Sequence, residues 1–486
     1  MKKLAVILLL LTHITVAAQV KTNSQDSLAA DKIVKQLIGF YNNDEFSAIH
    51  KMLSDEFRQS TSESNTITFY RANLKSPLGK INNYHYAGAG KRGILFMVDF
   101  ERSKLSLEIM LNTSNQISGI LWLPFENKKL IPGPRDPKSI QTNNPRKTSL
   151  QIKIDAVAMN YLKDPNNSSL SIGIVDKDKT ELFFYGETKK GTHELPTSSS
   201  LYEIASISKT FTAILLARAV NEGKIKLNDD IRKYLPGDFN QLQFKGSPIK
   251  IINLSNHTSG LPSLPDDFDK QQGFDPANPY LHYPKEGIYA FLRKFKPDTI
   301  PGSVSVYSNL GFAVLGTILE NVYQMPLEQL LQKNITGPLK MLNTHYEVAA
   351  PQDKFMVTGY SDETGKAVSY WNLENFKAAG GLKSTVSDML LYLKANINEI
   401  NADYSLSHQP TDHQEDFKRG LAWMIQPLDN DTVVWHNGGT AGFRSYCGFI
   451  PGKKAGVIVL SNSSASVDEA GLELLRDIIY SAVPQK

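Results

Sequence analysis

Ser206 and Lys209 lie three residues apart in the stretch LYEIASISKTFTAILLARAVNEGK, where a mixed run of residues gives way to an apolar one. In a helix, residues at this spacing share one face, so the lysine amine can approach the serine hydroxyl. A serine becomes a nucleophile when a neighbouring base takes its proton, and lysine can do this when burial or another cation lowers its pKa. The alternative is structural: Ser206 caps the helix, and Lys209 lies partly exposed on a solvated face. Alone, the pair is a weak signal.

Tyr307 and Asn309 form a Tyr-x-Asn triplet that follows a Pro-Gly turn and enters a strongly apolar segment. This context would fix a phenol and an amide at the start of a buried helix. Two other triplets of this kind begin at Tyr41, which ends a helix near the N-terminus, and at Tyr370, which lies in a polar loop. The alternative for Tyr307 is a partly buried tyrosine whose hydroxyl is simply hydrogen-bonded. Context therefore makes Tyr307 the second candidate for proton transfer.

His436, Asn437, Gly438 and Gly439 end an apolar strand in the stretch DTVVWHNGGTAGFRSY. Glycines at this place let the backbone of a substrate approach the edge of a sheet, and the N–H of Gly439 can donate to an oxyanion. A single histidine at the end of a strand is more often structural or solvated. The adjacent glycines and the order of the motifs along the chain favour a functional triplet here.

The order of these motifs resembles that of the penicillin-recognising serine hydrolases: serine with lysine (S-x-x-K), then Tyr-x-Asn, then Lys/His-x-Gly near the C-terminus. In detail, residues 150–486 are similar to the class C β-lactamase-related group, which also includes D-alanyl-D-alanine carboxypeptidases, D-aminopeptidases and esterases. Supporting segments are LSNHTSGLPS from Leu254, AAGGLKSTVSDML from Ala378 and RGLAWMI from Arg419. The resemblance implies a β-lactamase/transpeptidase-like fold of class α/β (α+β), with a mainly antiparallel sheet flanked by helices and a helical subdomain.

The resemblance also implies roles for the motif residues. Ser206 would be the acylated nucleophile, at a helix N-terminus whose dipole favours developing negative charge. Lys209 and Tyr307 would share the proton transfers, and which of them is the base stays open. The backbone N–H groups of Ser206 and Gly439 would form the oxyanion hole, and Asn309 would bind the amide side chain of the substrate.

His436 would contact the far end of the substrate, where β-lactamases of this group usually carry lysine. Another K-x-G triplet, starting at Lys454, has the pattern of a hairpin turn between two strands. With an ordinary pKa of about 6.5, His436 would be a hydrogen-bond donor at neutral pH and a cation only in acid. Arg444 would restore a cation if its side chain turned inward; the alternative is that it points to solvent. Histidine here counts against efficient β-lactam hydrolysis.

The expected function is that of an exported serine hydrolase that forms an acyl-enzyme at Ser206 on an amide or ester, such as a D-amino-acid-containing peptide or a small ester. The alternatives are a penicillin-binding sensor that acylates and barely deacylates, a β-lactamase, and an inactive binding module. Nothing in the motifs calls for a cofactor or a metal ion. The expected partner is a small-molecule or peptide substrate.

Composition limits the class of protein. The chain has 486 residues, of which 41% are hydrophobic and 21% charged, so it is an ordinary globular protein with room for about two or three domains. The net charge of +4 is small, and no basic block carries interleaved aromatic residues, which argues against a nucleic-acid partner. Cys447 is the only cysteine and lies in an apolar strand pattern, so no intrachain disulfide and no reactive thiol is expected.

The N-terminus reads MKKLAVILLLLTHITVAAQV, two lysines followed by a short apolar run and small residues. This is the layout of a signal peptide, residues 1–18, cleaved after Ala18, and it predicts a periplasmic or secreted protein. An uncleaved anchor is the alternative, but the apolar run is short for a membrane span. No lipid-acceptor cysteine follows the cleavage point, and no stable membrane span is expected after it.

Three regions follow the signal peptide. Residues 26–125 read as one helix and three short antiparallel strands, a small α+β domain that resembles nuclear-transport-factor-like or cystatin-like folds in element order alone. Residues 126–149 carry four prolines and read as a linker. Residues 150–486 form the hydrolase domain, whose first and last strands are expected to share one antiparallel sheet, with a helical insertion between them. A helix is expected to end at Gly223.

Overall fold

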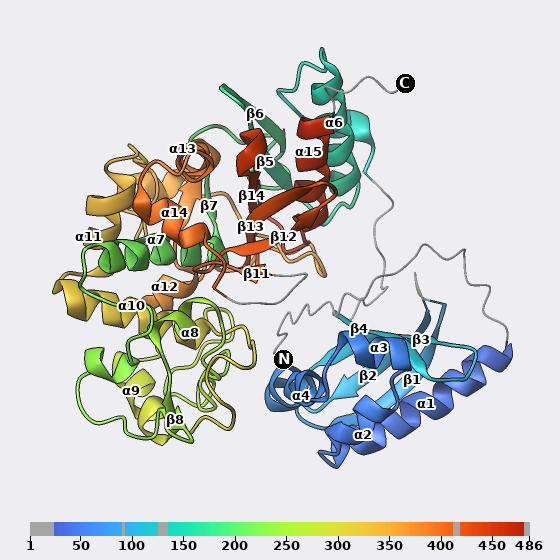
Figure 1. Ribbon diagram of the computed structural model, residues 1–486. Coiled ribbons are helices and arrows are strands. Elements are labelled where there is room, and N and C mark those ends of the chain that lie inside the picture. Colours follow the sequence, from blue (N-terminus) through green and yellow to red (C-terminus); the bar gives the residue numbers. More distant parts are fainter. Residues whose placement is uncertain (1–23, 90–92, 125–134, 412–417, 481–486) are drawn as a thin grey trace. The chain divides into compact units, whose positions relative to one another are not determined.

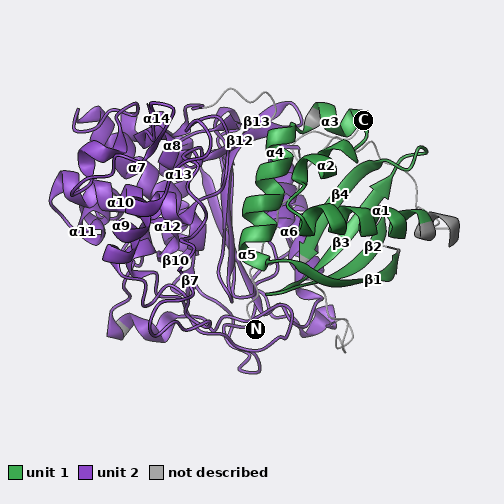
Figure 2. Ribbon diagram, turned by 90° about the horizontal axis from the view of Figure 1, so that it is seen from below, with its two compact units in different colours: residues 1–129 green, residues 130–486 purple. Residues whose placement is uncertain are grey.

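The computed structural model describes residues 24–89, 93–124, 135–411 and 418–480 (Figure 1). The chain divides into two compact units, residues 1–129 and 130–486 (Figure 2). The predicted signal peptide, residues 1–18, lies outside the described residues. Within the described part of the chain, no helix is long and apolar enough to cross a membrane.

The first unit is an antiparallel sheet in the order β1-β2-β3-β4, with one long helix and several short ones. Helix α1 contributes Ala30, Val34 and Leu37 to a core that it shares with the inward-facing side chains of the strands. The elements are α1 (Ser24–Asn42), α2 (Phe46–Lys51), α3 (Asp55–Ser60), α4 (Glu63–Thr68), a π-helical turn (Phe69–Lys75), α5 (Ser76–Leu78), β1 (Ile81–Ala89), β2 (Ile94–Phe100), β3 (Lys104–Leu111) and β4 (Ile117–Pro124).

The predicted helix and the three predicted strands β2, β3 and β4 are confirmed in this unit. The sequence did not predict β1 or the short helices between α1 and β1. Helices α2 and α3 span six residues each, too few for an apolar period to show, whereas α4, the π-helical turn and α5 are continuous over residues 63–78 and begin in a polar stretch. Strand β1 reads INNYHYAGA, without an apolar alternation. The α+β class therefore holds, with one strand more than expected.

The second unit is built on a seven-stranded sheet, antiparallel throughout, in the order β11-β12-β13-β14-β15-β5-β6. The first and last parts of the domain meet where β15 pairs with β5, as expected from the sequence. The strands are β5 (Ser169–Asp176), β6 (Lys179–Gly186), β11 (Lys418–Arg419), β12 (Met424–Leu428), β13 (Asp431–Gly439), β14 (Arg444–Ile450) and β15 (Ala455–Ser461).

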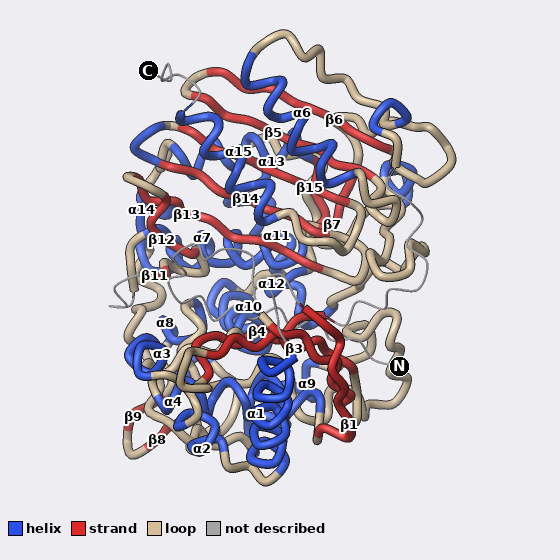
Figure 3. Tube along the Cα trace, turned by 90° about the vertical axis from the view of Figure 1, so that its right-hand side faces the viewer, coloured by secondary structure: helices blue, strands red, loops and turns tan. Residues whose placement is uncertain are grey.

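Helices cover both faces of this sheet. Helices α6 (Ser149–Leu162) and α15 (Asp468–Tyr480) lie over one face (Figure 3), where they pack on Val457 and Val459. Helix α13 (Val386–Ile397) packs on the other face, toward which the alternating residues of β15 point. The approach of α13 is so close that a Cβ on Gly173 would lie 2.9 Å from Leu390 Cγ. Glycine is required there because the helix occupies the space of a side chain.

The long segment between β6 and β11 forms the helical subdomain. It contains α7, α8, α9, α10, α11, α12, α13 and α14, and the short strand pairs β7 with β10 and β8 with β9. The bounds not yet given are β7 (Leu201–Glu203), α7 (Ser208–Asn221), β8 (Gln243–Phe244), β9 (Ser247–Pro248), α8 (Ile251–Ser255), α9 (Lys285–Lys294), α10 (Asn309–Tyr323), α11 (Leu327–Leu331), α12 (Lys377–Gly380), β10 (Lys383–Thr385) and α14 (Ala402–His408). Helix α7 ends as predicted, because Gly223 follows it with a φ of +70°.

The predicted linker, residues 126–149, needs correction in its second half. Ile140 and Asn144 are buried, and the Asn144 amide contacts the Tyr185 hydroxyl of β6 at 2.6 Å. The guanidinium of Arg135 donates to the carbonyl of Asn167 at 2.9 Å. Residues from Arg135 on therefore pack as part of the second unit. The prolines had suggested a segment that packs on neither domain. They prevent regular helices and strands in this segment, but they do not prevent its side chains from packing on the second unit.

Candidate active site

Ser206 stands in a tight turn at the start of α7. A single 3₁₀ turn, Ala205–Ile207, leads directly into the helix, and Ala205 has a left-handed φ of +48°. The hydroxyl of Ser208 donates to the carbonyl of Ala205 at 2.6 Å and accepts from the N–H of Leu382 at 3.0 Å. These bonds hold the strained turn, a feature that clusters at functional sites. Ser206 is thereby presented, half-buried, at the N-terminal end of a buried helix.

Lys209 is fully buried, which corrects the expectation of a partly exposed side chain. Helix α7 is enclosed on all sides over most of its length, so it has no solvated face on which a lysine could lie. The rings of Tyr307 and Phe312 lie 4.7 and 5.5 Å from the amine. Burial lowers the pKa of Lys209 well below its ordinary value, because an apolar environment disfavours the charged amine.

The Lys209 amine contacts three oxygen atoms. Its Nζ lies 2.7 Å from Asn309 Oδ1 and 2.5 Å from the carbonyl oxygen of Ala379, and both oxygens only accept. The third neighbour is the Ser206 hydroxyl, 3.1 Å away. As an ammonium, Lys209 would donate to all three oxygens; as the neutral amine that burial favours, it donates to the first two and keeps its lone pair for the Ser206 hydroxyl. This arrangement can take the proton of the serine.

Tyr307 and Asn309 meet this pair from the start of α10. Ser308 caps the helix by accepting from the N–H of Gly311 at 2.8 Å. Tyr307 is half-buried; burial raises the pKa of its phenol, and the interaction with Ser206 opposes that effect. The phenol is therefore held in its protonated form beside the serine. A protonated phenol next to a serine can donate a proton, and it is a poor base.

The structure separates the three Tyr-x-Asn triplets. The Tyr41 hydroxyl donates to the carbonyl of Gly79 inside the first unit, and the Tyr370 hydroxyl donates to the carbonyl of Val357. Of these tyrosines, Tyr307 alone contacts Ser206 and Lys209 among the described residues. The context used in the sequence thus picked the triplet that lies at the site.

Strand β13 brings its last residues beside Ser206. Pairing of β12 with β13 reaches only Trp435, so residues 436–439 extend beyond β12. Gly438 lies against the turn that carries Ser206, because a Cβ there would be 2.3 Å from the carbonyl oxygen of Ile204. Gly439 is exposed. The strand therefore needs glycine at 438 to come this close, which adds a reason for glycine to the predicted approach of a substrate, and it offers its backbone next to the serine.

His436 is wholly buried, and its ring centroid lies 6.5 Å from that of Tyr307. Its Nδ1 lies 2.6 Å from the carbonyl oxygen of Asn437; a carbonyl only accepts, so Nδ1 carries the proton and Nε2 a lone pair. Burial first, and the nearby Lys209 second, lower the pKa of His436 to about 3. The expectation of a donor that titrates near pH 6.5 was wrong. The imidazole is neutral, and its remaining nitrogen is an acceptor.

Arg444 does not supply a cation to this site. Its neighbour in β14, Ser445, donates to the carbonyl of Ile204 and so faces the serine turn, and strand alternation places Arg444 on the opposite face. There its guanidinium donates to the carbonyl oxygens of Thr440 and Phe443 at 2.8 and 3.0 Å. The sequence left two alternatives for the Arg444 side chain: it points toward the substrate, or it points to solvent. The structure shows neither, because the side chain binds the backbone of the β13–β14 turn.

Two site residues were missed by the sequence analysis. Ala379, in the segment AAGGLKS, supplies the carbonyl that binds the Lys209 amine. His257, in LSNHTSGLPS, stacks on Tyr307 with ring centroids 4.3 Å apart. Both segments had been noted as similar to family segments without a role, so the signal was present. No sequence pattern predicts that the carbonyl of Ala379 contacts Lys209, or that a histidine in a loop contacts Tyr307, because the partners lie far apart along the chain.

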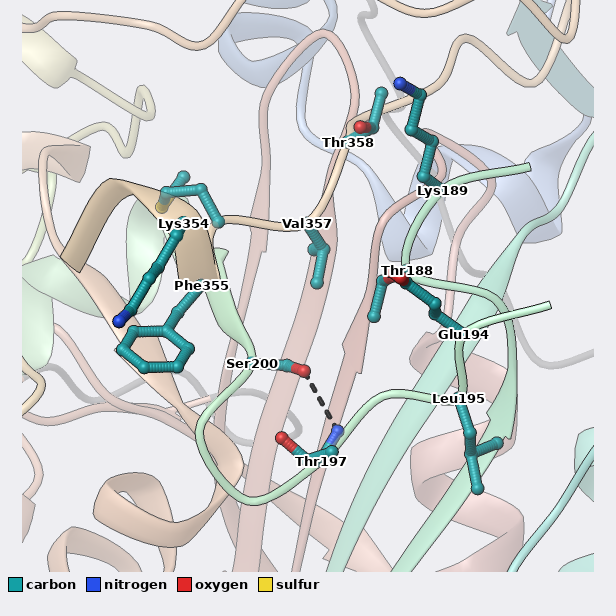
Figure 4. A pocket seen from close by; sticks show the side chains of 11 residues that line it. Thr188, Lys189, Glu194, Leu195, Thr197, Ser200, Lys354, Phe355, Val357 and Thr358 are labelled. Atoms are coloured by element: carbon teal, nitrogen blue, oxygen red, sulfur yellow. Dashed lines mark hydrogen bonds between the residues drawn. The ribbon is translucent and has the colours of Figure 1, made fainter. Parts of the chain in front are cut away.

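Further features of the second unit involve residues outside the three motifs. Lys454 turns the hairpin between β14 and β15 with a φ of +50°, as predicted. A hollow of about 550 Å³ lies between the loops 188–200 and 354–358 (Figure 4), and none of the motif residues lines it. Cys447 is buried, and burial raises the pKa of its thiol. In the described ranges, no group of three or more His, Cys, Asp or Glu side chains is placed to hold a metal ion.

Comparisons with known proteins agree with this geometry. The Beta-lactamase family model matches residues 154–480. The β-lactamase of Pseudomonas fluorescens is 26% identical over 362 residues, which cover 65% of this chain and 94% of that protein. The D-alanyl-D-alanine-carboxypeptidase/endopeptidase AmpH of Escherichia coli (strain K12) is 27% identical over 331 residues, which cover 64% and 83%. The β-lactamase/D-alanine carboxypeptidase structure from Pseudomonas syringae aligns with a TM-score of 0.61 at 23% identity, over 69% of this chain and 100% of that one.

Because the family match spans more than half of the chain, the protein belongs to the β-lactamase family. It is a serine hydrolase with the β-lactamase/transpeptidase-like fold. The family and fold expected from the three motifs are confirmed. The first unit, residues 1–129, lies outside the matched range.

Proposed function

We propose that Ser206 is the nucleophile and forms a covalent acyl-enzyme with an amide or ester substrate. The observation that carries this proposal is the buried Lys209 amine, 3.1 Å from Ser206 Oγ, whose two other contacts are oxygens that only accept. Few environments keep a lysine neutral, and here the neutral form faces a serine. Such a perturbed pKa beside a nucleophile is typical of catalytic sites.

Acylation then follows from the positions of the side chains. Lys209 Nζ takes the proton of Ser206, and the serine oxygen forms a bond to the carbonyl carbon of the substrate. The negative charge on the former carbonyl oxygen is stabilised by the backbone N–H groups of Ser206 and Gly439. The bond to the leaving group breaks as Tyr307 donates its phenolic proton to that group, and the Lys209 ammonium restores the proton of Tyr307. Deacylation runs the same steps in reverse with water.

This assignment makes Lys209 the base and Tyr307 the acid. Burial lowers the pKa of the lysine and raises that of the phenol, so the free enzyme holds a neutral amine and a protonated phenol. The opposite assignment needs a tyrosinate next to an ammonium, in a place where burial disfavours both charges. Asn309 accepts from the amine through Oδ1, and its amide nitrogen, which donates one N–H to the Tyr280 hydroxyl at 3.5 Å, has a second N–H to bind the substrate.

The substrate we favour is a D-amino-acid-containing peptide or a small ester with a neutral group near His436. A buried neutral imidazole that offers a lone pair binds an N–H or O–H group of the substrate and gives no charge to a carboxylate. Its low pKa keeps the preference unchanged from pH 5 to 8. The β-lactamase and D-alanine carboxypeptidase relatives make β-lactams and D-alanyl peptides the comparison substrates.

A penicillin-binding sensor is the second candidate, because it needs the same nucleophile and base and differs only in slow deacylation. An inactive binding module is disfavoured by the intact contacts among Ser206, Lys209 and Asn309. We further propose that residues 1–18 direct export to the periplasm or the medium, and that the first unit binds a substrate or partner.

A substrate panel tests the proposal. Purified protein is given a D-aminoacyl amide, a D-alanyl-D-alanine peptide, a short-chain ester and a β-lactam, each with wild type and with Ser206→Ala. Turnover of a neutral D-aminoacyl amide or ester that is lost in the variant supports the hydrolase. Acylation by the β-lactam without turnover of any of the four would identify the sensor.

A further inference from the structure

His257 lies in the loop after α8, buried, with a left-handed φ of +63°. This conformation is strained and uncommon for a residue with a side chain, so the surrounding structure must require it. The effect here is that the carbonyl and the imidazole of the same residue both reach the chain around Tyr307.

The contacts of His257 bracket Tyr307. The N–H of Val306 donates to the His257 carbonyl at 2.8 Å, and the N–H of Ser308 donates to His257 Nδ1 at 3.1 Å. The ring lies on the phenol with centroids 4.3 Å apart and planes 32° apart. The backbone on both sides of Tyr307 and one face of its ring are thus held by a single residue.

The tautomer of His257 follows from the same bonds. A backbone N–H only donates, so the Nδ1 that accepts from Ser308 is unprotonated, and the neutral ring carries its proton on Nε2. Protonation of Nδ1 would break this bond. Burial first, and then the nearby Lys209, His436 and Arg419, hold the pKa of His257 well below its ordinary value. His436 carries its proton on Nδ1 instead, so the two histidines near Tyr307 have opposite tautomers.

We propose that His257 is a positioning residue for acyl transfer, which fixes the backbone and the ring of Tyr307 so that the phenol faces Ser206 and Lys209. This inference rests on the proposed function of Ser206 and Tyr307. It assigns the loop segment LSNHTSGLPS a task in the reaction rather than in packing alone. The alternative is a purely structural histidine whose loss lowers stability and leaves proton transfer unchanged.

Two substitutions separate the contacts that His257 makes. His257→Phe keeps an aromatic ring against Tyr307 and removes the acceptor for the Ser308 N–H. His257→Asn removes the ring and keeps an acceptor oxygen near the place of Nδ1, and asparagine tolerates positive φ. His408→Phe is the matched control, since His408 is also buried but is bonded to Glu399 and Asn396.

The measurement is kcat/KM for hydrolysis of the D-aminoacyl amide, because its amine leaving group needs the proton of Tyr307. We expect His257→Phe to lower kcat/KM at least ~30-fold, less than the roughly 10²–10⁴-fold that complete loss of a proton-transfer group costs, and His257→Asn to recover part of the rate. The His408→Phe control should stay within about twofold of wild type. In a Tyr307→Phe background, His257→Phe should lower the measured rate by less than about a further threefold, because the effects of coupled residues are not additive.

A kcat/KM of His257→Phe within about threefold of wild type would overturn the inference, as would an equal loss of kcat/KM in the Tyr307→Phe background. NMR of ¹⁵N-histidine-labelled protein gives a readout that does not depend on activity. We expect an Nε2–H tautomer for the His257 signal, assigned by its loss in His257→Asn, and Nδ1–H for His436. An Nδ1–H tautomer for His257 would refute its contact with Ser308, and with it this inference, even if Ser206 is the nucleophile. The expected tautomers together with no fluorophosphonate labelling of Ser206 would instead count against the proposed function alone.

Discussion

Replacement of Lys209 by methionine tests whether the buried amine is neutral. Methionine has a similar length and no amine, so the variant removes the titrating group and keeps most of the packing. It also leaves Asn309 Oδ1 and the carbonyl of Ala379 without their partner, which costs roughly 1–3 kcal/mol for each buried acceptor. That loss does not depend on pH. The change of stability with pH therefore isolates the amine.

The expected slope follows from proton linkage. In the unfolded chain Lys209 holds its proton up to its ordinary pKa of 10.5, whereas burial lowers the pKa in the folded protein. The unfolded state then binds one more proton, so the stability of the wild type rises with pH until the pH passes 10.5. The slope is about 1.4 kcal/mol per pH unit, and between pH 7 and 9 the wild type should gain about 2.7 kcal/mol relative to Lys209→Met.

Urea unfolding at pH 7, 8 and 9, followed by fluorescence, measures this difference in a Trp122→Phe background, in which the remaining tryptophans, Trp371, Trp423 and Trp435, all lie in the second unit. The exposed Lys270, replaced in the same way, is the control and should give a constant difference from wild type. A constant difference for Lys209→Met as well would show that the folded protein holds a protonated lysine. The amine would then not be the base.

Three further predictions follow from the site and the domain boundary. Because burial lowers the pKa of His436 from 6.5 to about 3, the unfolded state binds the extra proton between these values, and in urea unfolding the wild type should lose about 2.3 kcal/mol relative to His436→Gln between pH 6.5 and 4.5. Equal losses in the two proteins would contradict this. A methyl at Gly438 overlaps the carbonyl next to the serine turn, so Gly438→Ala should lower kcat/KM at least ~10²-fold, while Gly452→Ala, whose methyl meets nothing within 4 Å, should not. A fragment that starts at Pro145 should fold with a Tm several degrees below that of one that starts at Pro134, because it lacks the packed part of the expected linker; equal Tm values would show that those contacts add nothing.

The sequence predicted the parts of the site that depend on chain-local pattern. Serine and lysine on one turn, a triplet at the start of an apolar helix, and glycines at a strand end each have a local cause, and their order along the chain supplied the family. The sheet was predictable for the same reason, since β5 with β6 and β14 with β15 are hairpins whose strands alternate or run apolar.

The environment of each group was not predictable, because it comes from distant segments. Lys209 is buried because α10 and α12 enclose α7, and no local pattern distinguishes an enclosed lysine from a solvated one. His436 has a low pKa because of what covers it, and Arg444 faces away because of the register between β13 and β14. These corrections change the chemistry of the site. His436 is a neutral acceptor and not a donor that titrates near pH 6.5, and Arg444 supplies no cation to the substrate.

The central claim, that Ser206 is the nucleophile, is tested most directly by locating a covalent adduct. The purified protein is treated with a fluorophosphonate probe, digested and mapped by mass spectrometry, beside Ser206→Ala. Ser208 and Ser308 are internal comparisons, since both are buried and donate to the carbonyl oxygens of Ala205 and Pro262. We predict one adduct, on Ser206, that is absent from the variant. An adduct on Ser208 or Ser308, or full labelling of Ser206→Ala, would contradict the account.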